Sequence, residues 1–334
     1  MPPESTALPA PPVSASLPAP WRTPLASLGA AVFVLIAVTA HSWGAMLHQW
    51  WNIDTYNHLL FVPFIAAWLA ALKEEELAAL TPQAFWPGLL LVAAALGLWG
   101  AGEASGINLL AQAGAVAAVQ AAVLTVLGVR VSLLLALPLA FASFMVPFGD
   151  EIIAPLQTIT AEIAIALTHL SGVPARIEGI HIYTPAGLFI VAEACSGVKF
   201  LIAMVTLAVL VCFTRFTHWR RRTVFLAACI IVPILANGVR AWATIYVAQF
   251  IGAERASGFD HIVYGWIFFA IVVVAMLGGA WRFFDREPED YGWRAETIAS
   301  WPSVVRAEAL RFAPTSAALA IIVLAGVAAL AALL

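Results

Sequence analysis

A succession of long apolar runs is the feature that most constrains what this chain can fold into. The hydrocarbon core of a bilayer is about 30 Å thick, and a helix crosses it with about 20 apolar residues. The runs predict an all-α polytopic membrane protein with about nine transmembrane helices. The nine segments are Pro24–Leu47, Leu59–Leu72, Phe85–Ala101, Ile107–Val129, Val131–Phe148, Ser196–Thr214, Thr223–Ile251, Phe259–Trp281 and Thr315–Leu334.

The composition of the chain excludes the main alternatives to a membrane fold. Hydrophobic residues make up 63% of its 334 residues and charged residues 10%, whereas soluble domains average about 45–50% and about 25%. The chain therefore lacks the polar residues that cover a soluble enzyme, and it is too apolar to be disordered. Three Cys residues cannot form a disulfide framework, and a net charge of −3 gives no reason to expect a nucleic-acid partner. The partner that the composition implies is the lipid bilayer.

The Lys and Arg residues predict the orientation of the segments, because basic residues gather in cytoplasmic loops. A cytoplasmic N-terminus and an external C-terminus (N-in, C-out) place twelve of the sixteen basic residues in internal segments. The other four lie in external loops or inside predicted helices. The twelve are Arg22, Lys73, Arg130, Arg215, Arg220, Arg221, Arg222, Arg282, Arg286, Arg294, Arg306 and Arg311.

The chain divides into four regions. Residues 1–23 are a Pro-rich cytoplasmic extension that lacks the apolar core of a signal peptide, and we expect this extension to be disordered. Residues 24–281 hold the transmembrane core, residues 282–314 form a charged cytoplasmic linker, and residues 315–334 add a C-terminal transmembrane helix.

One external loop, Gly149–Ala194, is long enough to fold by itself. In Asp150–Leu170 apolar residues recur at helical spacing between polar ones, which predicts an amphipathic helix that lies at the outer interface or caps the bundle. In Ala175–Ala194 two β-rich runs flank Thr184–Gly187, which predicts a short β-hairpin. Non-helical backbone near a membrane needs protein or water to satisfy it, so we expect this loop to cover a cavity.

Cys195 is the first residue that could carry chemistry. It lies in Glu193-Ala-Cys195-Ser196-Gly197, at the outer start of a predicted helix. A helix N-terminus favours an anion, so it lowers the pKa of a thiol and can hold an oxyanion. In an extended segment Glu193 would share the face of Cys195. The alternative is a small, packed cysteine, which is our interpretation of Cys212 and Cys229 in their apolar runs.

Two further polar positions follow along the chain. Arg240 lies 17 residues after Thr223, or about 25 Å along a helix, near the outer boundary of the membrane core, and shares a face with Asn237. It either faces the bundle interior or extends to the outer head groups. His261 follows Asp260 at the start of another helix and shares a face with Tyr264. It is either a proton carrier or an interfacial histidine, and Asp260 either orients it or caps the helix.

The topology brings these positions to one level. The loop charges alone place Cys195, Arg240 and His261 at the outer ends of three consecutive helices. A thiol, a fixed cation and an imidazole at one depth suit a nucleophile, an oxyanion stabiliser and an acid–base catalyst. Such a trio fits attack on a carbonyl and resolution of a thioester. We find no metal-ligand spacing and expect no cofactor.

The sequence resembles the exosortase/archaeosortase family of membrane cysteine transpeptidases. The resemblance rests on Glu193–Gly197, on Pro233-Ile-Leu-Ala-Asn237-Gly-Val-Arg240 and on His261-Ile-Val-Tyr264-Gly-Trp-Ile-Phe-Phe269, in the order and separation of the family. A fourth motif, Trp51–His58, resembles a family feature that usually reads Tyr-Ser-His-Gly. Here Asn57 precedes His58 and Leu59 follows it, a departure that puts a role for His58 in question. The resemblance covers roughly Trp51 to Trp281.

The resemblance implies a function. Cys195 would be the nucleophile, Arg240 would stabilise the oxyanion and His261 would handle protons, with Ser196, Gly197 and Asn237 in support. Substrates would be membrane-anchored proteins whose C-terminal sorting signal joins a short motif (Pro-Glu-Pro in one class), a transmembrane helix and a basic tail. Cleavage would occur at the outer face of the inner membrane, alongside exopolysaccharide production. A transporter, a non-catalytic envelope-assembly protein and a membrane acyltransferase are the rival hypotheses, and either water or another acceptor would resolve the thioester.

Overall fold

Eight helices in the described part of the chain are long and apolar enough to cross a membrane. The computed structural model describes residues 19–256 and 260–332, with the backbone alone for residues 260–263, so the predicted extension lies almost wholly outside it. The long helices are α1 (Ala19–Val38), α5 (Gly88–Ser105), α6 (Asn108–Leu134), α8 (Ile153–Leu170), α9 (Val198–Arg215), α10 (Trp219–Ile251), α12 (Asp260–Trp281) and α15 (Pro314–Ala332).

Shorter elements connect these helices. The short helices are α2 (Ala40–Asn52), α3 (Val62–Ala71), α4 (Glu74–Ala78), α7 (Ala136–Ala142), α11 (Ala253–Ala256), α13 (Ala295–Ala299) and α14 (Pro302–Glu308). The 3-10 turns are η1 (Asn57–Phe61), η2 (Ser143–Met145), η3 (Asp150–Ile152), η4 (Glu193–Cys195) and η5 (Pro288–Asp290). The strands are β1 (Ala84–Phe85), β2 (Arg176–Glu178), β3 (His181–Thr184), β4 (Gly187–Ile190) and β5 (Arg311–Phe312).

Seven of the nine predicted segments correspond to long helices, and the other two are shorter than predicted. The second is η1 followed by α3. The fifth is divided between the end of α6, α7 and η2, because the backbone leaves helical geometry at Leu135. Gly128, with a φ of +85°, breaks α6 close to the predicted boundary between the fourth and fifth segments. A side chain at Gly128 would overlap the backbone of Gln83, so this turn requires glycine. Apolar periodicity does not reveal the break at Leu135, since both sides of it are equally apolar.

The first predicted segment, Pro24–Leu47, is longer than the helix that forms. α1 ends at Val38, and the backbone leaves helical geometry at Thr39, whose hydroxyl donates to Leu35 O at 2.7 Å. The chain then enters α2, which buries Met46 and Trp50 and exposes polar residues on its other face. The predicted segment continued past Thr39 because α2 is itself half apolar, so the apolar run does not end where α1 ends.

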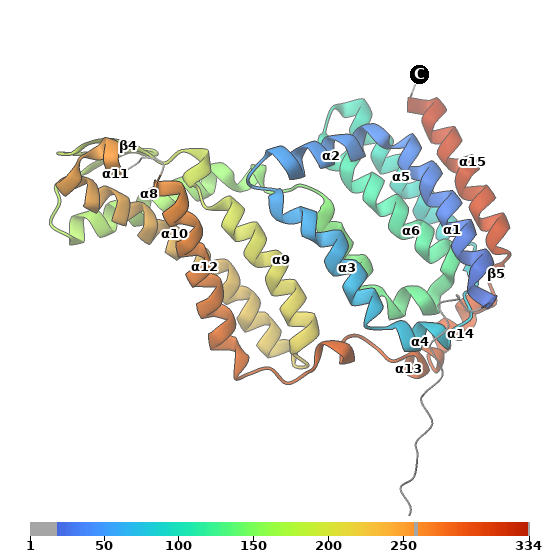
Figure 1. Ribbon diagram of the computed structural model, residues 1–334. Helices are drawn as coiled ribbons and strands as arrows, with labels where there is room; N and C mark the ends of the chain where they lie inside the picture. Colours follow the sequence, from blue (N-terminus) through green and yellow to red (C-terminus); the bar gives the residue numbers. More distant parts are fainter. Residues whose placement is uncertain (1–18, 257–259, 333–334) are drawn as a thin grey trace, which may run out of the picture.

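The bundle has two parts joined by α3 and α7 (Figure 1). On one side α1, α5, α6 and α15 pack together through small apolar residues, among them Ala31, Ala118 and Ala325. The predicted C-terminal helix is thus packed on α1 and α5. On the other side α9 lies beside α10, and α10 beside α12.

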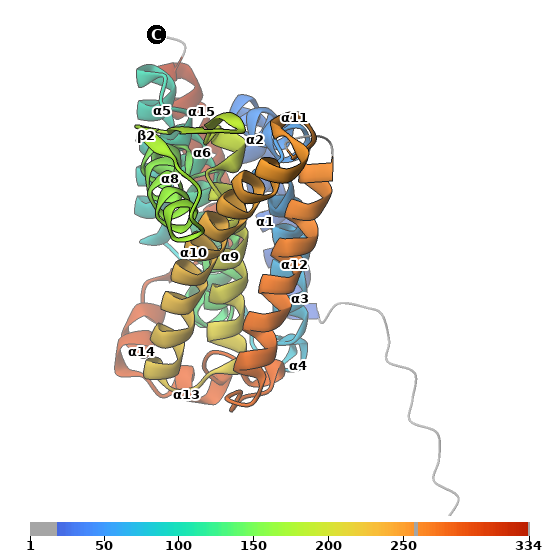
Figure 2. The same ribbon diagram turned by 90° about the vertical axis from the view of Figure 1, so that its left-hand side faces the viewer.

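The predicted outer loop forms a cover over the second part. The amphipathic helix is η3 with α8, which packs against α10 on the side away from α12 and is seen nearly end-on in Figure 2. Strands β3 and β4 pair antiparallel with Thr184 opposite Gly187, at the turn where the hairpin was predicted. Strand β2 pairs with β3 and makes a three-stranded sheet, one strand more than the prediction.

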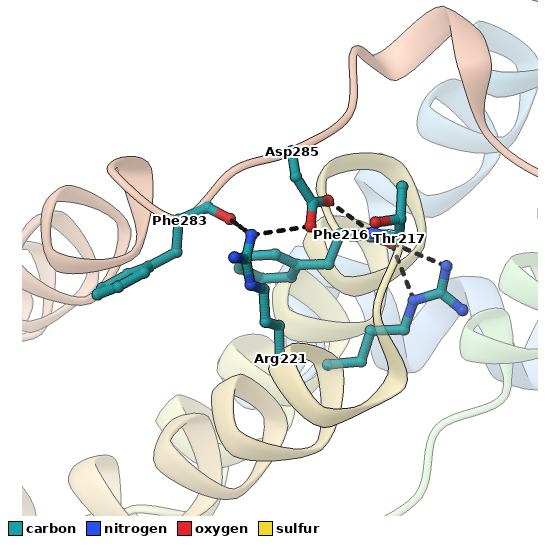
Figure 3. A network of polar contacts seen from close by, with 6 residues as sticks. Phe216, Thr217, Arg221, Phe283 and Asp285 are labelled. Carbon is teal, nitrogen blue, oxygen red and sulfur yellow. Dashed lines mark hydrogen bonds and ion pairs between the residues drawn. The ribbon is translucent and has the colours of Figure 1, made fainter.

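The opposite end of the bundle carries most of the basic residues that set the predicted topology. Arg221 donates to Phe283 O at 2.9 Å and to Asp285 Oδ2 at 2.8 Å, and the backbone N–H of Thr217 donates to Asp285 Oδ1 at 2.7 Å (Figure 3). These bonds tie the α9–α10 connection to the end of α12. The predicted linker also packs here, since Tyr291 is fully buried and donates to Leu69 O at 2.8 Å.

Candidate active site

Cys195 lies in η4, directly before the first turn of α9, and its side chain is half-buried. Its backbone N–H donates to Ala192 O at 2.8 Å, which closes the short turn. Gly197 follows with a φ of +85° and starts α9. A Cβ on Gly197 would lie 2.8 Å from Cγ of Asn237, so only glycine fits between the thiol segment and α10. The predicted placement of Cys195 at a helix N-terminus matches this geometry.

Asn237 is the buried residue that connects the Cys195 segment to the rest of the site. Its Nδ2 donates to Cys195 O at 2.8 Å and to Thr160 Oγ1 at 3.0 Å. The Thr160 hydroxyl in turn donates to Ser196 O at 3.4 Å. Asn237, Thr160 and Ser196 are each at most 3% exposed. Buried polar groups of this kind are costly when unpaired, so the network fixes the backbone that carries the thiol.

Arg240 lies one helical turn above Asn237 and shares its support. Its Nε and Nη2 donate to Asn237 Oδ1 at 3.4 and 3.3 Å. Asn237 therefore holds the Cys195 backbone with its amide nitrogen and the guanidinium with its amide oxygen. Gly265 of α12 faces the same guanidinium, and a Cβ there would lie 3.1 Å from Nη1. The face of α10 that Asn237 and Arg240 were predicted to share thus points toward the start of α9 and toward α12.

An aromatic group closes the site on the α9 and α12 side. Phe200 stacks on Phe269 with ring centroids 4.4 Å apart and meets Trp266 edge-on at 6.4 Å. Two cations lie over the ring of Phe200, Arg240 at 5.9 Å and Lys199 at 5.2 Å from its centroid. Two cations therefore lie beside the first turn of α9, the turn that follows Cys195 in the chain.

Sequence reasoning missed Lys199 and Thr160 as parts of this site. Lys199 was counted only as one of the basic residues outside the internal loops. Thr160 was treated as a polar interruption of an amphipathic helix. A signal existed for Thr160, because it shares the helical face of the apolar Leu156 and Ile163, where a polar side chain needs a buried partner.

Five of the predicted site residues have side chains that no described hydrogen bond joins to this network, and His58 is one of them. Asp260 and His261 begin α12, and their side chains lie outside the described residues. Glu193 and Tyr264 are exposed, Tyr264 by 66%. The positions of Asp260 and His261 in α12 bring their backbone to the sheet end of the bundle, the end that holds Cys195 (Figure 1).

The motif around His58 is linked through Tyr56 to the residues that precede α8, and these lie beside the first turn of α9. The Tyr56 hydroxyl donates to Asp150 Oδ1 at 2.6 Å, and the adjacent Gly149 lies against Val198 in the first turn of α9. Burial and the hydrogen bond to Asp150 raise the pKa of Tyr56, so the phenol stays protonated as the donor. His58 itself is half-buried in η1, and no described hydrogen bond joins it to the Cys195 segment.

The comparisons with known proteins give one match. The family model described as Transmembrane exosortase (Exosortase_EpsH) matches residues 50–278, which is more than half of the chain. The matched range contains every predicted site residue and leaves out α1 and α15. No curated protein and no solved structure matches this chain.

Proposed function

The chain belongs to the transmembrane exosortase family, and on that premise we propose that it is a membrane-embedded cysteine protease or transpeptidase with Cys195 as its nucleophile. Membership of the family supports a protease-like or transpeptidase-like role in the membrane. The observation that carries the assignment of residues is Asn237, whose amide bonds both Cys195 O and the guanidinium of Arg240. A nucleophile and a cation on one buried support suit attack on a carbonyl group.

The proposed chemistry has two steps. The Cys195 thiol gives its proton to His261, the resulting thiolate attacks the carbonyl carbon of the scissile peptide, and Arg240 stabilises the oxyanion that forms. When the tetrahedral intermediate collapses, the C–N bond breaks, the departing amine takes a proton from His261, and a thioester remains on Cys195. A second nucleophile, either water or an acceptor group, then gives up its proton to His261 and displaces the thiolate.

The substrate class that we propose is a membrane-anchored protein with a C-terminal sorting signal. The transmembrane helix of such a signal would reach α9, α10 and α12 by diffusion in the bilayer plane. This confines the scissile bond to the depth of Cys195 and lowers the entropy cost of the encounter. Cleavage would take place on the outer side of the inner membrane, in a pathway associated with exopolysaccharide.

The test is processing of a tagged protein with a sorting signal in cells that carry the enzyme. We expect Cys195→Ala and Cys195→Ser to abolish processing at unchanged expression, and Arg240→Ala and His261→Ala to reduce it severely. Cys212→Ala is the matched control, because this thiol is buried in α9 at the basic end of the bundle. Full processing by Cys195→Ala would eliminate the thiol mechanism.

A further inference from the structure

An apolar groove lies between α10 and α12 at the basic end of the bundle, away from Cys195. Arg220 and Arg221 stand at one end of it, and the rest of its lining is apolar. The apolar residues are Phe216, Val224, Phe225, Ala228, Ala275, Met276, Gly279, Ala280 and Phe283. Along α10 the lining runs from residue 220 to residue 228, which is about 12 Å of helix. The groove is therefore amphipathic, with a cationic end and an apolar length.

Small residues create this groove. Ala228 on α10 and Ala275, Gly279 and Ala280 on α12 leave space where larger side chains would interlock. An added Cβ on Gly279 would meet no heavy atom within 4 Å, so nothing described in this protein fills the space beside it. A membrane protein does not leave such a surface empty, because lipid chains pack against it.

The rim of the groove is fixed by the network in Figure 3. Arg221 bonds Phe283 O and Asp285, so its charge is paired and the start of α10 is held to the end of α12. Arg222 is also occupied, since it donates to Phe216 O at 2.8 Å. These bonds preform the mouth of the groove.

Arg220 has no carboxylate partner among the described residues. Its recorded contact is with the ring of Trp219, at 5.9 Å from the centroid, and its side chain is exposed. A guanidinium in this position has its donors available to a ligand, and its paired N–H donors match the oxygens of a phosphate.

We propose that this groove binds an anionic phospholipid, with the phosphate on Arg220 and one acyl chain along α10 and α12. Basic pockets between transmembrane helices recognise anionic head groups in this way. One cationic group beside one apolar slot matches one head group and one chain. A transmembrane helix is about 10–12 Å in diameter, and the bonds of Arg221 to Phe283 and Asp285 hold α10 and α12 together at the mouth of the groove.

Lipid retention by the purified full-length protein tests this proposal. The protein in detergent is delipidated, offered phosphatidylglycerol or phosphatidylcholine of the same chain length, and analysed by native mass spectrometry. We expect wild type to retain phosphatidylglycerol about tenfold more than phosphatidylcholine, because both lipids offer Arg220 a phosphate but phosphatidylcholine also carries a choline cation, which the guanidinium repels. Arg220→Gln should bring the two lipids to the same level.

Two matched pairs of variants separate the groove from general effects. Arg306→Gln changes an exposed arginine of α14 outside the groove and should retain lipid like wild type. Gly279→Leu should fill the slot and reduce retention of both lipids, whereas Gly278→Leu, on the neighbouring position outside the lining, should not. Melting temperatures check that each variant is folded.

Three results would overturn the proposal. Equal retention of the two lipids by wild type would show that the groove does not select an anionic head group. Unchanged retention in both Arg220→Gln and Gly279→Leu would show that the lipid does not bind in the groove. Displacement of phosphatidylglycerol by a sorting-signal helix, with cross-links from that helix to Ala275, would assign the groove to substrate instead. None of these results depends on Cys195, so they leave the proposed function untouched.

Discussion

Replacing Thr160 by Val tests whether the buried network below Cys195 serves catalysis. Valine keeps the shape and branching of threonine and removes only the hydroxyl. That hydroxyl accepts from Asn237 Nδ2 at 3.0 Å and donates to Ser196 O at 3.4 Å. Its loss leaves two buried groups without a partner, one N–H of Asn237 and the carbonyl of Ser196.

The magnitude follows from these two groups. The lost bond to Ser196 O is long, at 3.4 Å, and contributes little. The lost bond from Asn237 Nδ2 is shorter, at 3.0 Å, and accounts for most of the expected effect. An unpaired buried donor costs about 1–3 kcal/mol. If Asn237 turns to recover a partner, it releases Cys195 O or the guanidinium of Arg240. We therefore expect processing per folded molecule to fall roughly 5- to 150-fold, the range that corresponds to this energy.

The assay compares Thr160→Val with Thr158→Val. Thr158 is on the same helix, is exposed, and donates only to Ala154 O in its own turn. Processing of the tagged substrate is measured against the amount of folded enzyme, with the melting temperature in detergent as the second readout. Thr158→Val should behave like wild type in both.

Separate outcomes distinguish a positioning residue from a structural one. The positioning role is supported if Thr160→Val slows processing and a separate Asn237→Ala variant slows it as much or more. A lower melting temperature with wild-type processing per folded molecule would refute it, because the hydroxyl would then matter for stability alone. Wild-type values in both readouts would show that the network is not required at all.

Three further predictions concern other contacts. Gly238→Ala should lower the melting temperature, because its Cβ would lie 2.7 Å from Cβ of Ile163. A second change, Ile163→Ala, should recover most of the lost melting temperature, and no recovery would refute the steric explanation. Lys199→Met should reduce processing about fivefold, the worth of one cation–π contact beside the site, and Lys199→Arg should restore it; unchanged processing in Lys199→Met would contradict this. Partial burial raises the pKa of Asp285, but the hydrogen bonds from Thr217 and the charge of Arg221 lower it on balance below its ordinary 3.8. The stability that Asp285 adds is therefore present above about pH 4 and lost as the pH falls through its folded pKa, so the melting temperatures of wild type and Asp285→Asn should converge in acid.

The long helices and the basic end of the bundle were predictable because each depends on local sequence. A run of apolar residues forms a helix wherever it crosses a membrane, and arginines at helix ends stay together because they avoid the bilayer core. Segments failed where one residue redirected the chain. Leu135 and Thr39 turn the backbone inside apolar runs, and neither leaves a mark in hydropathy.

The candidate site was predictable only in outline. Cys195, Arg240 and Asn237 stood out because a thiol at a helix start and polar groups inside an apolar helix have few structural uses. Thr160 and Lys199 did not, since their surroundings come from other elements. Thr160 lies 77 positions from Asn237 along the chain, and Lys199 meets Trp266 of α12.

The sequence by itself determined that this protein is a multi-pass membrane protein of the exosortase family, and which end of each helix carries charge. Those properties reside in single segments and motifs. Only the tertiary structure decided that Asn237 supports both the Cys195 backbone and Arg240, that α8 packs against α10, and that a groove opens between α10 and α12. These depend on distances between side chains from separate helices, and packing sets such distances after the helices have formed.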